Sequence, residues 1–317
     1  MRVLAIGECM AELAPMVAQG SAAGSYQMGF AGDTYNTLWY LAQLSSDVTV
    51  SYFTAVGDDA ISAQMLETFG QGGIDSRFVQ VISGKSVGLY LISLDNGERS
   101  FSYWRSASAA KQLAKNKDAL KDAMDQSDLI YFSGITLAIL GQDGRDTLLN
   151  EARAARSAGK RIVFDPNLRP HLWDSPSIMT DNIMQAAAVA DIALPSFDDE
   201  ASWFKDANPV ETLRRYAQAG VETVIVKNGA YPILCQTGDA YDTFDVPPLA
   251  SIVDTTAAGD SFNAGILSGL ATHAPLSQSI PLACKLARHV VQGRGALVPI
   301  EQSLISQFTT QPHRQTT

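Results

Sequence analysis

Short apolar runs alternate with amphipathic stretches along most of this chain, and this alternation restricts the fold more than any other feature. Apolar runs occupy positions 3–6 and 129–132, and a further buried strand is expected at 221–226. Runs that are apolar throughout are typical of strands buried on both faces of a parallel sheet. Stretches with a helical period, such as 61–70 and 143–158, separate the runs. The sequence therefore predicts an α/β fold with helices on both faces of a parallel sheet.

The stretch 254–265, DTTAAGDSFNAG, opens a helix after this alternation. Its small residues let a ligand come close to the backbone, and they are Ala257, Ala258 and Gly259. Amide groups in a first helical turn lack internal partners and carry positive potential, so they suit a phosphate. Asp260 would repel that phosphate unless it accepts the proton of an attacking hydroxyl. We predict the amides of 257–259 as an anion hole and Asp260 as a general base.

A simpler interpretation of the same residues stays open. Thr256 or Asp254 would then cap an ordinary helix, and Asp260 would complement the helix dipole without any ligand.

The full string, however, resembles the C-terminal signature of the ribokinase-like (PfkB) carbohydrate kinases, which phosphorylate a sugar hydroxyl with ATP. Where this chain has Ala257, that family commonly has glycine. The resemblance extends over roughly residues 1–300. It implies one ribokinase-like three-layer α/β/α domain over residues 1–317, with a mostly parallel central sheet. It also implies a small β lid, inserted in that domain and formed by about 9–30 and 86–105.

A second helix opens at the stretch 31–36, AGDTYN. Asp33 and Asn36 would face whatever lies at the start of this helix, although a capped helix without a ligand fits these residues as well. The stretch is similar to the N-terminal substrate signature of the family, with Ala31 in place of one glycine. The resemblance implies substrate contacts from Gly32, Asp33, Thr34 and Asn36.

Residues 86–105 give the clearest hairpin signal, because an Asn-Gly pair at 96–97 forms a favoured two-residue turn. That register sets Tyr90 opposite Tyr103 and places both tyrosines and Arg105 on one face. Two phenols and a guanidinium would bind a polyhydroxy acid, with Arg105 taking the carboxylate in a two-pronged contact. The alternative is a half-exposed hairpin with a snorkelling arginine, and a one-residue slip would reverse the faces.

Polar residues also follow the strand expected at 161–164, at the sheet edge where ligands bind in open α/β folds. The spacing of Asp165, Asn167 and Arg169 is similar to a family element. Arg169 is expected to be a second cation for an acid group or for the transferring phosphate. The resemblance implies that Asn167 contacts the substrate and that Asp165 acts through metal-bound water. A turn rich in proline and asparagine is the alternative.

We expect the nucleotide to bind near the ends of the next two strands. Asp199 aligns best with a family glutamate that acts through magnesium-bound water, although acidic residues also suit a first helical turn. Lys227 would meet ATP phosphates, and a solvated lysine is the alternative. The predicted nucleotide contacts are Ser196, Lys227, Asn228, Gly229, Ala230, Thr255, Ala258 and Gly259.

Some positions depart from the family pattern. Ser196 stands where relatives commonly have asparagine, and Cys284, in a helix expected at 282–292, stands where they have a nucleotide-contacting asparagine. In relatives, the loop at 293–296 and the loop around Asp254 hold a monovalent cation such as K⁺.

The composition limits the partners. The net charge of −10 and the pI near 4.8 argue against nucleic acid or an anionic membrane as a partner. No run reaches the roughly 18 apolar residues of a membrane span, and the N-terminal apolar run is too soon interrupted for a signal peptide. Three cysteines without metal-ligand spacing fit a reducing cytoplasm. A dinucleotide oxidoreductase is poorly supported, since no Gly-x-Gly-x-x-Gly follows the first strand.

These observations predict a Mg²⁺- and ATP-dependent kinase. Two arginines directed at one neutral sugar would be costly to bury without an anion, which favours a sugar acid. The resemblance makes 2-keto-3-deoxygluconate, converted to its 6-phosphate, the leading substrate. A neutral sugar such as fructose or ribose is the runner-up, and a catalytically idle sugar-binding regulator is an alternative of another class. A lid of this kind often pairs with its copy, so we expect a homodimer or higher homo-oligomer.

Overall fold

The computed structural model describes residues 1–16, 24–95, 98–238, 240–249 and 251–309. The strands of its central sheet are β1 (Arg2–Ile6), β4 (Thr49–Phe53), β9 (Leu129–Ser133), β10 (Arg161–Asp165), β11 (Ile192–Ala193), β12 (Thr223–Val226), β13 (Ile233–Thr237) and β14 (Ala240–Phe244). They lie in the order β14-β13-β12-β11-β10-β9-β1-β4. Neighbours pair in parallel from β12 to β4, while β13 and β14 pair antiparallel. The predicted mostly parallel sheet is confirmed.

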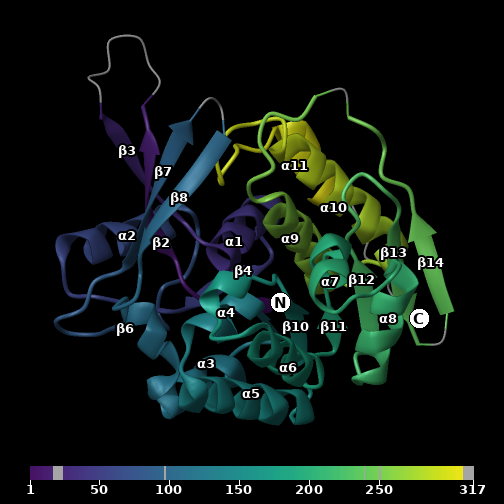
Figure 1. Ribbon diagram of the computed structural model, residues 1–317, viewed down its shortest axis with the longest axis horizontal. Coiled ribbons are helices and arrows are strands. Elements are labelled where there is room, and N and C mark those ends of the chain that lie inside the picture. The colour runs from purple at the N-terminus through teal and green to yellow at the C-terminus, as the bar shows by residue number, and fades with distance from the viewer. Residues whose placement is uncertain (17–23, 96–97, 239, 250, 310–317) are drawn as a thin grey trace.

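Helices cover both faces of this sheet (Figure 1). One layer contains α1 (Asp33–Leu44), α2 (Ala60–Gln71), α9 (Ala258–Ala271), α10 (Leu276–Val290) and α11 (Gln302–Thr309). The other contains α3 (Lys117–Asp125), α4 (Gly134–Ile139), α5 (Gln142–Ser157), α6 (Pro176–Ala187) and α8 (Pro209–Gln218). The remaining helices are α7 (Phe197–Trp203) and the short 3₁₀ helices η1 (Ala109–Lys115) and η2 (Pro170–Leu172). The chain therefore folds into three α/β/α layers.

Strand β1 shows why its run is apolar at every position. Val3 and Ala5 pack in the core beneath α1 and α9, while Leu4 and Ile6 pack in the core beneath α3 and α5. All four side chains are fully buried. Because successive residues of a strand face opposite sides, a strand between two helical layers needs apolar residues throughout.

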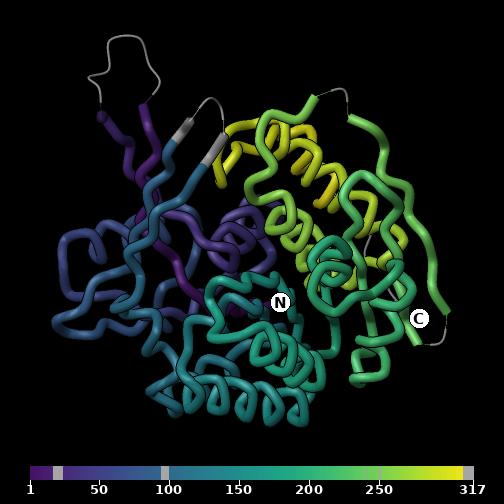
Figure 2. Tube along the Cα trace, in the orientation of Figure 1, coloured from purple at the N-terminus to yellow at the C-terminus, as the bar shows by residue number. Residues whose placement is uncertain are grey.

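A four-stranded sheet stands to one side of the central sheet (Figures 1 and 2). Its strands are β2 (Met10–Pro15), β3 (Tyr26–Ala31), β7 (Gly88–Asp95) and β8 (Glu98–Trp104), in the order β3-β2-β7-β8. We call this sheet the lid. Tyr90 lies opposite Tyr103, as the hairpin register predicted. The turn at 96–97 that suggested this register lies outside the described residues, as does 17–23 within the other part of the predicted lid.

The helix expected at 282–292 begins earlier, at Leu276, and continues through Pro281. Close packing against α9 explains how the helix forms despite a proline, which removes one backbone hydrogen bond. A Cβ added at Gly265 would lie 2.7 Å from Cα of Ala283, and one added at Gly269 would lie 2.0 Å from Oγ of Ser279. Glycines in α9 thus let the two backbones approach each other.

Short strands β5 (Ala55–Val56) and β6 (Gln80–Val81) pair beside the central sheet and complete the described strands. None of the described helices combines the length and the apolar character that crossing a membrane requires.

Ala257 adopts backbone angles of φ 59° and ψ 16°, in the left-handed region. A side chain in this region costs about 1–2 kcal/mol, whereas glycine adds roughly 0.4–1 kcal/mol of unfolded-state entropy. We expect Ala257→Gly to raise the free energy of unfolding by about 0.5–1 kcal/mol, as measured by urea denaturation.

The neighbouring Ala258 provides the matched control, since it lies within α9. Glycine within a helix is expected to lower the free energy of unfolding by about 0.5–1 kcal/mol. Equal destabilisation by both substitutions would show that Ala257 is not strained.

Candidate active site

The N-terminus of α9 is open rather than capped. Ala257 is the N-cap residue and makes no side-chain capping bond, while the hydroxyl of Thr256 donates to Asp254 at 2.7 Å. The ordinary capped helix that the sequence left open is therefore wrong. Of the predicted anion-hole amides, that of Ala258 donates to the carbonyl of Thr255 at 3.2 Å. Beyond its own helix, the atom nearest to a Cβ added at Gly259 is Nζ of Lys227, 3.6 Å away.

Asp260 lies in the first turn of this helix and is held from the other side of the site. Asn36, on α1, donates from Nδ2 to Oδ2 of Asp260 at 2.8 Å. Burial and then the nearby carboxylate of Asp33 raise the pKa of Asp260 to about 8, although the Asn36 hydrogen bond acts in the opposite direction. A carboxylate with this pKa is suited to take a proton near neutral pH.

The first turn of α1 does not present all the residues that the sequence assigned to the substrate. Thr34 is fully buried and its hydroxyl lies 2.9 Å from the hydroxyl of Tyr52, so the predicted substrate contact of this side chain is wrong. At Gly32 the close approach is made by protein backbone, because an added Cβ would lie 2.2 Å from the carbonyl oxygen of Glu8. Both polar groups of the Asn36 side chain are bonded within the protein, since its Oδ1 also accepts from the amide of Gly32 at 3.3 Å.

Asp33 and Asn167 come together from α1 and from the loop after β10. Asn167 donates from Nδ2 to Oδ2 of Asp33 at 2.8 Å, and the amide of Thr34 donates to Oδ1 at 2.8 Å. Asn167 has φ 34°, a left-handed conformation that asparagine tolerates better than most residues. Burial raises the pKa of Asp33. Two stretches that the sequence assigned to the substrate therefore meet.

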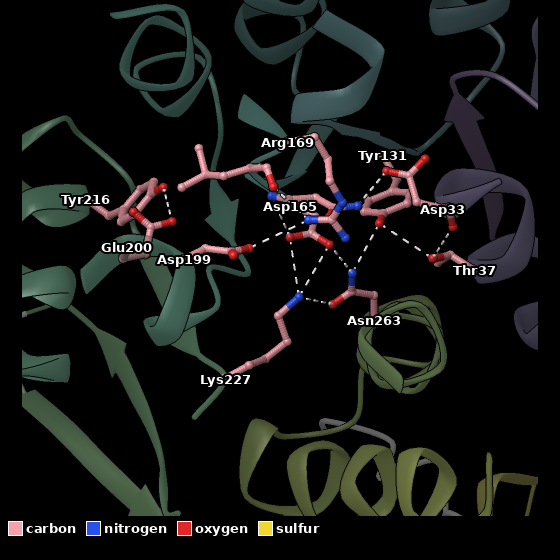
Figure 3. A network of polar contacts seen from close by, with 12 residues as sticks. Asp33, Thr37, Tyr131, Asp165, Arg169, Asp199, Glu200, Tyr216, Lys227 and Asn263 are labelled. Carbon is pink, nitrogen blue, oxygen red and sulfur yellow. Dashed lines mark hydrogen bonds and ion pairs between the residues drawn. The ribbon is translucent and has the colours of Figure 1, made fainter. Parts of the chain in front are cut away.

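Asp165 lies at the centre of the network in Figure 3. Asn263 donates to its Oδ2 at 2.7 Å, and Nζ of Lys227 lies 3.3 Å from both of its carboxylate oxygens. The amide of Asn167 donates to Oδ1 at 3.3 Å. These contacts fill the four acceptor positions of a carboxylate. Asp165 is thus already bonded within the protein, and its role through metal-bound water stays a prediction.

Asp199 remains accessible at the edge of this network. Its Oδ2 forms a long ion pair with Nη1 of Arg169 at 3.8 Å. The side chain of Asp199 is 36% exposed and that of Arg169 is 43% exposed. Burial raises the pKa of Asp199 and Arg169 lowers it. In the described part of the chain, no three His, Cys, Asp or Glu residues are grouped to hold a metal ion by themselves. A Mg²⁺ that keeps several waters and is shared with phosphates needs no such group.

A cleft of about 530 Å³ lies beside the N-terminus of α9. All eight predicted nucleotide contacts line it, namely Ser196, Lys227, Asn228, Gly229, Ala230, Thr255, Ala258 and Gly259. Cys284 lines it as well, at the position where relatives have asparagine. Apart from Asp198 and Arg288, apolar residues form the remaining wall and include Ile233, Val246, Leu249, Ile252 and Phe262. A flat apolar base and a chain of phosphates would both find a suitable surface here.

Arg105 has an unforeseen partner in Glu8, which follows β1 after Gly7. The two form an ion pair in which the side chains are 13% and 1% exposed. Ser108 donates to the other oxygen of Glu8 at 2.6 Å. The protein itself therefore supplies the anion that the sequence argument reserved for a substrate. A carboxylate at the C-terminal end of a buried parallel strand is the signal that identifies Glu8.

The tyrosines of the lid differ in their surroundings. Tyr90 is buried and donates its hydroxyl hydrogen to Glu12, so towards a ligand it can only accept. Tyr103 is 44% exposed, and its ring lies 6.1 Å from that of His171, a residue that the sequence interpretation missed. Burial lowers the pKa of His171 most, and the positive charges of Arg169 and Arg105 lower it further. Both arginines therefore act on the same small region between the lid and the body.

Comparisons with known proteins agree with this geometry. Residues 1–303 match the family described as pfkB family carbohydrate kinase. A relative in Haemophilus influenzae named 2-dehydro-3-deoxygluconokinase is 38% identical over 94% of this chain and 95% of its own length. A protein of the same name in Escherichia coli K12 is 36% identical over 95% and 98%. The structure of aminoimidazole riboside kinase from Salmonella enterica with aminoimidazole riboside and an ATP analogue has a TM-score of 0.82, 23% identity and coverage of 98% and 100%.

Proposed function

The chain belongs to the pfkB family of carbohydrate kinases, and on this basis we propose that it transfers the γ-phosphoryl group of ATP to 2-keto-3-deoxygluconate, also called 2-dehydro-3-deoxygluconate. The product is the 6-phosphate. One observation carries the assignment: Asp260 directly follows two residues that line a nucleotide-sized cleft at the N-terminus of α9, and it is bonded to Asn36 of α1.

The substrate assignment rests on charge and on relatives. Proteins 36–38% identical to this chain carry the name of the kinase that acts on this acid. Arg105 and Arg169 both act on the pKa of His171 and are the groups that we assign to the carboxylate of the acid. The ion pair with Glu8 uses Nη2 of Arg105, and we assign its other donors to the substrate carboxylate. Asp33 and Asn167 are assigned to the sugar hydroxyls, and Tyr103 borders them.

ATP and Mg²⁺ are the cofactors, and the residues present fit them. The amides at the start of α9 and Lys227 suit the phosphates, while the apolar wall of the cleft suits the adenine. We assign Asp199 to hold Mg²⁺ through water, since it is a partly exposed carboxylate on which the charges of Arg169 and Lys227 both act. Mg²⁺ neutralises charge on the phosphates when it is bound.

The residues of the chain perform three tasks. Asp260 accepts the proton of the attacking hydroxyl, and Asn36 keeps one carboxylate oxygen occupied so that the other points to the substrate. The amides at 257–260 stabilise the negative charge that builds up at the transferred group. The lid covers the sugar and excludes water, which limits hydrolysis of ATP.

We expect kcat/KM to fall as the pH drops below about 8, because Asp260 accepts a proton only when it is ionised. Removing the Asn36 amide should move this acidic limb to higher pH, since its hydrogen bond favours the ionised form. Steady-state rates of wild type and Asn36→Ala between about pH 6 and pH 9 check this. A flat wild-type profile over that range would contradict the assignment of the base.

Release of ADP, measured by a coupled assay with 2-keto-3-deoxygluconate, gluconate, fructose and ribose, tests the function as a whole. We expect strong activity on the keto-deoxy acid alone. Activity on a neutral sugar alone would keep the kinase and discard the sugar acid. ATP binding without turnover of any of these substrates would favour the regulator.

The outer face of the lid supports a homodimer. Trp104 is 60% exposed and Tyr26 41%, and both lie on the face opposite Tyr90. Exposed apolar faces of this kind mark interaction surfaces, and a second copy of the lid offers the same apolar chemistry.

We assign a monovalent cation to the loops at 254–257 and 293–296, where Asp254 already joins the two by accepting from the amide of Gly295 at 2.7 Å. A cytoplasmic location fits an ATP-dependent enzyme with three free, buried cysteines.

A further inference from the structure

Glu8 has no role in the reaction as described so far, although it is among the most deeply buried carboxylates of the chain. It is 2% exposed, and its two oxygens accept from Arg105 and Ser108. Gly88 makes this pair possible: an added Cβ there would lie 3.0 Å from Oε1 of Glu8 and 3.1 Å from Cβ of Arg105. The lid is therefore built to bring Arg105 against Glu8.

With this arrangement, the guanidinium of Arg105 is the partner of two carboxylates, that of Glu8 and that of the bound sugar acid. Without substrate, Glu8 neutralises Arg105, which would otherwise be a buried cation without an anion. With the sugar acid bound at Arg105, two negative charges lie close to the same guanidinium. Like charges a few ångströms apart in a site of low dielectric repel each other strongly. Each of the two pairings with Arg105 therefore weakens the other.

We propose that Glu8 is a specificity-determining residue that competes with the carboxylate of the sugar acid for Arg105. It lowers the affinity for the acid and recaptures the guanidinium when the phosphorylated acid leaves. The proposal rests on the proposed function, since it requires the substrate carboxylate to bind at Arg105. Arg169 has no such competitor of equal strength, because Asp199 lies 3.8 Å away and is partly exposed.

Glu8→Gln tests the competition directly. Glutamine keeps an acceptor for Arg105 and places an amide near Ser108, so the shape of the pair is retained while its negative charge is lost. Isothermal titration without ATP should show a Kd for 2-keto-3-deoxygluconate that is about tenfold lower than in wild type. The Kd for 3-deoxyfructose, in which CH₂OH replaces the carboxylate, should change by less than about twofold. Damage to the fold would weaken both ligands, whereas the proposal requires a gain for the acid alone.

Ser108→Ala is the second variant, and it tests the proposal even where Glu8→Gln does not fold. It removes the 2.6 Å hydrogen bond to Glu8, so that Glu8 depends more strongly on Arg105. The acid should then bind several-fold more weakly, again with little change for 3-deoxyfructose. Glu12→Gln is the matched control, because it removes a carboxylate of the same lid whose partner is Tyr90 rather than an arginine. It should change the affinities for both ligands equally.

An affinity of Glu8→Gln for the acid that is equal to or lower than that of wild type would overturn the proposal, provided that wild type binds and phosphorylates the acid. Equal affinities of Ser108→Ala and wild type for the acid would overturn it as well. A wild-type protein that neither binds nor phosphorylates the acid would instead overturn the proposed function, and with it this competition. The two failures are therefore distinguishable.

Discussion

Asp260→Asn is expected to lower kcat by about 10³-fold with the sugar acid, because an amide cannot accept the proton of the attacking hydroxyl. The substitution keeps the shape of the side chain, and Asn36 can still donate to its carbonyl oxygen. The Kd values for ATP and for the acid should change by less than about threefold, since neither ligand needs the negative charge of Asp260 to bind. Single-turnover kinetics and isothermal titration measure the two quantities separately.

Ser261→Ala is the control for this substitution. Ser261 is the next residue of α9, is fully buried and donates locally to the carbonyl of Ala258. A kcat close to that of wild type is expected for it. Comparable losses in both variants would point to a disturbed helix rather than to a missing base. Undiminished turnover in Asp260→Asn would remove the base from the mechanism altogether.

Arg105→Gln is expected to lower kcat/KM for 2-keto-3-deoxygluconate by about 100-fold, which corresponds to the roughly 2–3 kcal/mol of a hydrogen bond to a charged group. Turnover of 3-deoxyfructose should change little, because it offers no carboxylate to the arginine. The comparison of kcat/KM for the acid and for its neutral analogue is the measurement. An equal loss with both substrates would mean that Arg105 does not bind the carboxylate.

The same substitution should also affect stability. It leaves Glu8 buried without its cation, which is expected to lower the free energy of unfolding by about 3 kcal/mol in urea denaturation. The double variant Glu8→Gln/Arg105→Gln removes both charges and should recover most of this loss. It should not recover activity on the acid. The structural and the functional contributions of Arg105 are separated in this way.

Much of the fold followed from local patterns. Continuous apolar runs predicted buried parallel strands, and the Asn-Gly pair at 96–97 predicted a register that the pairing of Tyr90 with Tyr103 confirms. The helix expected at 282–292 was the exception, because it begins at Leu276 and contains Pro281. Its packing against the glycines of α9 is a property of two segments together, and no local pattern contains it.

The candidate site was predictable in its parts but not in its connections. Residues 254–260 revealed the open helix N-terminus, and the eight nucleotide contacts proposed from the sequence all line one cleft. Thr34 was misassigned, since it points into the core. The carboxylate of Asp165 already accepts hydrogen bonds from Lys227, Asn263 and Asn167. A residue type at a helix start or strand end indicates that a side chain lies near a ligand edge. It does not indicate whether the protein already uses that side chain.

The sequence by itself determined the class of fold and was enough to predict a base and a phosphate-binding turn, because each depends on periodicity or on neighbouring residues in one segment. The tertiary structure alone decided which polar groups meet. Asn36 and Asp260 are 224 positions apart, and Glu8 and Arg105 are 97 apart. Hydrogen bonds and ion pairs over such separations depend on how layers and lid pack, and burial then fixes their energies and pKa values.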